Sequence, residues 1–132
     1  MLDMFVYYFE TKKFIFVHGW IPTKNNQYDN NWRNATKKEW EKSRWQNPVE
    51  MYKNKVYEPG KTIVCGHWHC SALWHAKNPE LYDEFGPKEK FVPFITKDMI
   101  ALDACTAYTK KVNCIVVDEE KILSEELGAK KL

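Results

Sequence analysis

The chain has 132 residues and a mass of 15.7 kDa, which allows one compact domain and hardly two. Hydrophobic residues make up 44% and charged residues 29%, as in ordinary globular chains, which excludes a disordered tail. The formal charge of +2 predicts neither a nucleic-acid partner nor binding to an anionic membrane. No apolar run is as long as a membrane span and the first residues lack a signal-peptide pattern, so we expect a cytoplasmic protein.

Four short apolar runs predict β-strands. Residues 14–17 are aromatic and β-branched and stop at a His-Gly pair, and residues 62–65 repeat the pattern and stop at Gly-His. Residues 99–102 and 112–117 supply two more strands, and the turn expected at 109–111 predicts that these two pair as an antiparallel hairpin. Because every residue of the first run is apolar, we expect that strand to be covered on both faces.

Helix is expected to be less abundant. Residues 35–45 predict a helix in which Thr36 and Glu39 form a capping box. A short amphipathic piece follows Pro48, and a further short turn of helix is expected from residue 78 toward residue 85.

Long irregular loops are expected over 21–34 and 71–91, and loops of this length in a compact domain usually have a function or are mobile. The charged end at 124–132 is expected to fray. Together these patterns predict a single α/β (α+β) domain over 1–132, with a mixed sheet, long loops and few short helices.

The four cysteines, Cys65, Cys70, Cys105 and Cys114, form no Cys-x-x-Cys pair, which excludes a zinc ribbon or a thioredoxin-type motif. Without a signal peptide we expect free thiols. Three of the four lie in or beside strand-like runs and are expected to be small buried hydrophobes.

The histidines carry the strongest chemical signal. His18 ends the first predicted strand, and His67 and His69 follow the second in the string Val-Cys-Gly-His-Trp-His. If the two strands are neighbours, the three imidazoles meet at one edge of the sheet, where ligand sites are expected. They are therefore candidate metal ligands, and the alternative is that they are polar loop residues packed beside a tryptophan. His75 is expected to be a surface or loop residue.

Four segments of the sequence together resemble a known protein family. The strings FIFVHGWIP, WEKSRW, TIVCGHWH and MIALDACTAYTKKVNCIVVDEE resemble the C-terminal half of calcineurin-like metallophosphoesterases, in particular the bacterial serine/threonine protein phosphatase branch. The resemblance covers roughly residues 8–120. It implies that the fold is the C-terminal half of that family's two-sheet sandwich.

The resemblance also implies hydrolysis of phosphoesters by a two-metal centre, in which two divalent ions about 3.5–4 Å apart hold a bridging hydroxide. His18 and His67 would be ligands of the second ion, and His69 would reach the first. The ions would be Mn, Fe, Zn, Ni or Co. The implied substrate is a phosphorylated protein or a small phosphoester.

Arg44 matches the family's arginine that clamps the substrate phosphate, a role suited to a guanidinium fork. The alternative is a surface arginine that stacks on the tryptophan after it or pairs with Glu41. Asn47 and Tyr108 are expected to line the same cleft. Asp103 follows a strand and is expected to satisfy loop amides or orient a ligand histidine.

The motifs of the family's N-terminal half are absent from the sequence, which contains neither Gly-Asp, Gly-Asn nor Asp-x-His. The metal-bridging carboxylate and the leaving-group acid are thus missing, and no catalytic residue is assigned within the chain. We expect a fragment of a longer phosphatase or a truncated gene product, with little metal affinity and no activity alone. Its expected partner is the missing half, or a second copy through the open sheet surface.

Two other interpretations remain open. In the first, the chain is a non-catalytic remnant that serves as a binding or self-association module. Alternatively, His18, His67 and His69 would hold a single zinc ion together with a water molecule.

Overall fold

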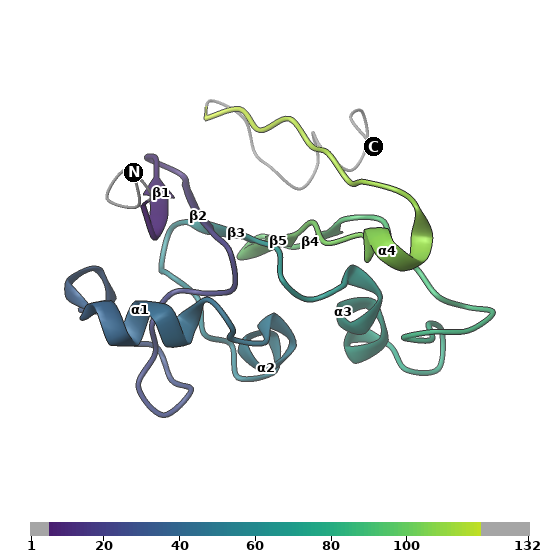
Figure 1. Ribbon diagram of the computed structural model, residues 1–132, viewed down its shortest axis with the longest axis horizontal. Coiled ribbons are helices and arrows are strands. Elements are labelled where there is room, and N and C mark those ends of the chain that lie inside the picture. The colour runs from purple at the N-terminus through teal and green to yellow at the C-terminus, as the bar shows by residue number, and fades with distance from the viewer. Residues whose placement is uncertain (1–5, 120–132) are drawn as a thin grey trace.

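The computed structural model describes residues 6–119 (Figure 1). It is a mixed α/β fold built on a five-stranded sheet of order β1-β2-β3-β5-β4. The expected α/β class, with a mixed sheet and few short helices, is confirmed. The elements in chain order are β1 (Tyr8–Glu10), β2 (Phe14–Val17), the 3₁₀ turn η2 (Trp32–Asn34), α1 (Lys37–Ser43), α2 (Pro48–Lys53), β3 (Thr62–Cys65), α3 (Cys70–Lys77), β4 (Phe94–Ile95), β5 (Met99–Ala101) and α4 (Thr106–Thr109).

Three parallel strands form the centre of the sheet. β2 pairs with β3 so that Ile15 lies opposite Ile63, and β3 pairs with β5 in the same direction. The edge strands β1 and β4 run antiparallel to their neighbours. Since β2 and β3 are parallel neighbours, the residues that follow them leave the sheet at the same edge.

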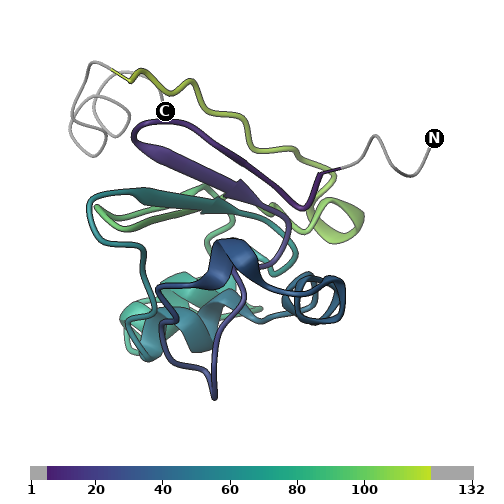
Figure 2. The same ribbon diagram turned by 90° about the vertical axis from the view of Figure 1, so that its left-hand side faces the viewer.

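The two faces of the sheet are covered differently. Helices α1, α2 and α3 lie on one face, over a core that includes the fully buried Trp32 and Leu73 (Figures 1 and 2). On the other face, Ile115 and Val117 of the extended segment 111–119 pack against Phe14 and its buried neighbours (Figure 2). The apolar composition of β2 is explained by this cover on both faces.

The expected hairpin between 99–102 and 112–117 is wrong. The antiparallel partner of β5 is β4, and the segment 111–118 is extended with no strand assigned to it. The side chain of Asn113 holds the segment by donating hydrogen bonds to the carbonyl oxygens of Phe91 and Leu102, at 2.6 and 3.0 Å. The apolar run that predicted a strand instead places Ile115 and Val117 on the sheet face, since apolar runs report burial rather than strand pairing.

The first two helix predictions are confirmed. α1 begins after Thr36, whose hydroxyl accepts from the Glu39 amide while the Glu39 carboxylate accepts from the Thr36 amide. α2 starts at Pro48, a residue preorganised for a first helical turn, and Asn47 caps it. The loop 21–34 is irregular apart from its final 3₁₀ turn.

The turn expected from residue 78 is present as a single turn, in which the Asn78 carbonyl oxygen accepts from the amides of Leu81 and Tyr82 at 3.2 and 3.1 Å. The helix that was not expected is α3, which ends at Lys77, just before that turn, and occupies the first part of the stretch 71–91 that was expected to be a loop. Its first four residues are all buried, so the sequence shows no separate apolar and polar faces. His75 therefore lies on a helix rather than in a loop, and its Nδ1 contacts the Tyr82 carbonyl oxygen at 2.8 Å.

Two cysteines rather than three are buried. Cys65 and Cys70 lie in the core, where burial raises the pKa of both thiols, whereas Cys105 is half-buried. Cys114 is exposed because it points outward from the alternating segment 111–119. Among residues 6–119, no helix is long and apolar enough to cross a membrane. The expected tail at 124–132 lies outside the described residues.

An ion-pair network fastens the loop before α1 to the sheet. Arg33 donates to both carboxylate oxygens of Glu10, and Lys61 donates to Glu10 at 2.6 Å. Arg33 also contacts Glu58 at 3.2 Å, and Glu58 accepts from the indole N–H of Trp32 at 2.8 Å. The Arg33 hydrogen bonds, followed by those of Lys61, lower the pKa of the Glu10 carboxyl to about 2.

Replacing Glu10 with Gln is expected to reduce the free energy of unfolding by about 2 kcal/mol at neutral pH, since hydrogen bonds to two cations are lost. Because the folded pKa of Glu10 is depressed, this stabilisation is present above the ordinary pKa near 4.5 and is lost as the pH falls toward 2. Urea denaturation of both proteins should therefore show a gap between midpoints at pH 6 that is much smaller at pH 2.5. The half-exposed Glu41→Gln variant is the control and should differ from the parent by less than about 1 kcal/mol. A gap that persists unchanged at pH 2.5 would contradict this account.

Candidate functional site

Two imidazoles lie side by side where the central strands end. His18 directly follows β2 and His67 follows β3, and their ring centroids are 5.1 Å apart with 52° between the planes. The two chain segments are joined at this point, because the Gly66 amide donates to the His18 carbonyl oxygen at 2.9 Å. His67 has a φ of 66°, a left-handed conformation that is uncommon for a residue other than glycine and that recurs at functional sites.

The end of α1 is brought against this pair by Gly19. A Cβ at Gly19 would lie 2.5 Å from the carbonyl oxygens of Ser43 and Arg44, so only glycine permits the approach. The next residue, Trp20, donates its amide to Ser43 at 3.1 Å. This contact places the two residues after α1 near the imidazoles, and the ring centroid of Trp45 lies 6.4 Å from that of His18 and 5.4 Å from that of His67.

The surroundings of His18 favour its neutral form. Burial has the largest effect and lowers the pKa of His18, the neighbouring His67 and Arg44 lower it further, and Asp103 opposes them. A neutral imidazole keeps a nitrogen lone pair, which is the form that binds a metal ion.

His69 has different partners. Its Nε2 lies 2.7 Å from Oε1 of Glu84, and its ring stacks on Trp68 and contacts Phe85 at centroid distances of 5.6 and 4.8 Å. Within residues 6–119, no three His, Cys, Asp or Glu side chains are grouped so that they could hold a metal ion. Of the three predicted ligands, His18 and His67 thus lie side by side, whereas His69 is hydrogen-bonded to the carboxylate of Glu84.

The other candidates make local contacts. Arg44 is half-exposed and its Nη1 lies 3.5 Å from Glu41, the pairing that was the alternative to a phosphate clamp. Asp103 accepts from the Cys105 amide at 2.7 Å, as expected for a carboxylate that satisfies loop amides. The side chain of Asn47 accepts from the first turn of α2, and the exposed hydroxyl of Tyr108 donates to Glu89.

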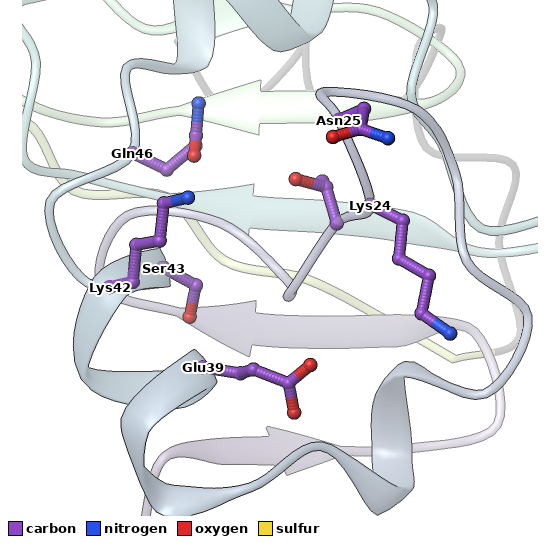
Figure 3. A pocket seen from close by; sticks show the side chains of 7 residues that line it. Lys24, Asn25, Glu39, Lys42, Ser43 and Gln46 are labelled. Carbon is purple, nitrogen blue, oxygen red and sulfur yellow. The ribbon is translucent and has the colours of Figure 1, made fainter.

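A polar hollow of about 310 Å³ beside α1 contains none of these candidates. Lys24 and Asn25 face Lys42 and Gln46 across it (Figure 3). Glu39, at its border, is engaged in capping α1. A second hollow of about 350 Å³ lies between α2 and α3, and Asn47 and Glu84 are among the residues that line it.

Glu84 was missed by sequence reasoning, and Trp45 was considered only as a surface on which Arg44 stacks. The place of Trp45 beside the two imidazoles could not be predicted from the string that contains it. Glu84 stands 15 residues after His69, and a single carboxylate in a loop gives no pattern from which the pairing follows.

Two neutral imidazoles would supply two ligands of one divalent ion, and two adjacent ions would require anionic oxygen ligands to offset their charge. Residues 6–119 bring the two imidazoles together but group no such carboxylates with them. Comparisons of this chain with protein-family models, with curated proteins and with solved structures find no match.

Proposed function

We propose that this chain supplies the C-terminal half of a two-metal phosphoesterase site. The observation that carries the proposal is the pair of neighbouring imidazoles at the ends of β2 and β3, with their ring centroids 5.1 Å apart. In this assignment His18 and His67 bind one divalent ion of the Mn, Fe, Zn, Ni and Co group. The lowered pKa of His18 supports its role as a ligand, since the neutral form is the one that binds.

The reaction would be hydrolysis of a phosphoester. The oxygen of water forms a bond to phosphorus, the bond from phosphorus to the ester oxygen breaks, and the alcohol leaves with a proton. When bound, two divalent ions supply the activated hydroxide for this attack. Arg44 would hold the phosphoryl oxygens, because its ion pair with Glu41 is half-exposed and costs little to exchange for a phosphate.

His69 would serve the other ion with Glu84 as its orienting partner. A histidine ligand commonly donates its second ring N–H to a carboxylate, which fixes the tautomer and the ring direction. The 2.7 Å contact between Nε2 and Glu84 leaves Nδ1 as the nitrogen free to act as a ligand.

The remaining ligands would come from a second polypeptide segment with the Asp-x-His, Gly-Asp-x-x-Asp and Gly-Asn-His motifs. This second polypeptide would pack on the apolar sheet face beside residues 111–119. There Phe9 contacts Phe16 and is 62% exposed. Substrates would be phosphorylated proteins or small phosphoesters.

Titration of the full chain with Co²⁺, followed by NMR of the histidine ring protons, tests the ligand assignment. We expect the signals of His18 and His67 to broaden first, and His18→Ala to remove the effect. His75→Ala is the matched control, since His75 lies on α3 and contacts a backbone carbonyl. Equal broadening of all four histidines, or an effect that survives His18→Ala, would contradict the assignment.

A further inference from the structure

Trp45 is the most exposed of the six tryptophans. Trp20, Trp32 and Trp40 are buried, with at most 4% of their surface exposed, whereas Trp45 is 68% exposed. A tryptophan left largely in water forgoes a large hydrophobic gain, and it is held in this position by the fixed end of α1. Its ring also contacts both imidazoles of the candidate site edge-on, with interplanar angles of 79° and 78°.

An aromatic strip of ring-to-ring contacts continues from Trp45 toward Tyr108, and its middle is partly buried, where Trp68 packs against the core. The ring of His67 contacts Trp68, Trp68 stacks on His69, and His69 contacts Phe85. At the far end Tyr108 meets Phe85 at 5.3 Å, and both are about half-exposed.

The charge along the strip selects against a polyanion. Glu84 contacts His69, and Glu89 accepts from the Tyr108 hydroxyl, so carboxylates flank the end of the strip that lies away from Arg44. A ligand with many phosphates would be repelled there, while a ligand with a single phosphate beside Arg44 would not.

We propose that Trp45 binds the organic part of the substrate, and that the substrate is a small phosphomonoester carrying an aromatic ring. This inference rests on the proposed phosphoesterase function. With the phosphate at His18, His67 and Arg44, the exposed Trp45 indole lies beside it, because its ring contacts both imidazoles. An aromatic group of the substrate stacks on this indole in an offset or edge-on arrangement. The ring is a nucleobase or a simple aryl group, and these two sources share the same stacking chemistry.

Binding is tested on the full chain by NMR of the indole N–H signals, with the Trp45 signal assigned from its loss in Trp45→Phe. Adenosine monophosphate, phenyl phosphate and methyl phosphate are titrated separately. We expect the Trp45 signal to shift with the two ring-bearing esters at concentrations at which methyl phosphate leaves it unchanged. Of the two, the ester that shifts it at the lower concentration identifies the source of the ring. An unmoved Trp45 signal, or an equal shift with methyl phosphate, would overturn the proposal.

Activity gives a separate readout once the complementing segment is supplied. Trp45→Ala should lower kcat/KM for the ring-bearing esters about tenfold and leave methyl phosphate unchanged, while Trp45→Phe should retain most of the activity. Leu81→Ala is the matched control, because Leu81 is an exposed apolar side chain outside the strip and the site. Turnover of every ester without any effect of Trp45→Ala overturns the aromatic specificity and leaves the proposed function standing. A ring-dependent shift of Trp45 without turnover of any ester supports the binding surface and counts against the phosphoesterase.

Discussion

Mixed with a polypeptide that carries the three N-terminal motifs, the chain is expected to hydrolyse p-nitrophenyl phosphate in the presence of manganese. Alone, it should turn this ester over no faster than its own His67→Ala variant. The physical reason is that an imidazole pair cannot hold two cations side by side, so the attacking hydroxide is not formed. In addition, no general acid protonates the leaving group. The difference between the complemented and the isolated chain should be several orders of magnitude.

Variants of the complemented enzyme identify the residues responsible. His18→Ala, His67→Ala and His69→Ala should each abolish turnover, while His75→Ala, on α3, should leave it within about twofold of the parent. Release of p-nitrophenol is the measurement. Rapid manganese-dependent turnover by the isolated chain, lost in His67→Ala, would show instead that carboxylates of this sequence complete the site.

Gly19→Ala is expected to damage both the fold and the site. The new methyl group would lie 2.5 Å from the carbonyl oxygens of Ser43 and Arg44, and neither backbone atom can yield as a flexible side chain would. The end of α1 must then withdraw from β2, which should lower the free energy of unfolding by about 1–3 kcal/mol. Because Arg44 and Trp45 move with that end, they should lose their positions beside His18.

Gly66→Ala is the matched control for this prediction. Gly66 also adjoins a site histidine, but a Cβ there would lie 3.7 Å from the His18 carbonyl oxygen, which is an ordinary contact. Urea denaturation should therefore place this variant within about 1 kcal/mol of the parent. A Gly19→Ala variant as stable as Gly66→Ala would refute the close approach of α1.

Local patterns predicted the elements whose signals are contained within a few residues. The strands 14–17 and 62–65 could be predicted because a short apolar, β-branched run followed by glycine has few other solutions. α1 could be predicted because its capping box lies entirely within four residues, from Thr36 to Glu39.

The errors arose where the same pattern has two solutions in space. The apolar run in 112–117 suits a strand at a sheet edge and equally a segment laid over a sheet face, and Asn113 selects the second by donating to two carbonyl oxygens. α3 was missed because its first turn is buried on all sides, which removes the helical periodicity from the sequence.

The sequence by itself determined that histidines follow two buried strands, since both features are local. Only the tertiary structure decided that those strands are parallel neighbours, which places His18 and His67 5.1 Å apart, and that His69 turns to Glu84. It also decided that Gly19 admits the end of α1 and so sets Trp45 beside the pair. Strand pairing and the packing of one backbone on another depend on contacts between distant residues, and a linear pattern of residue types does not contain them.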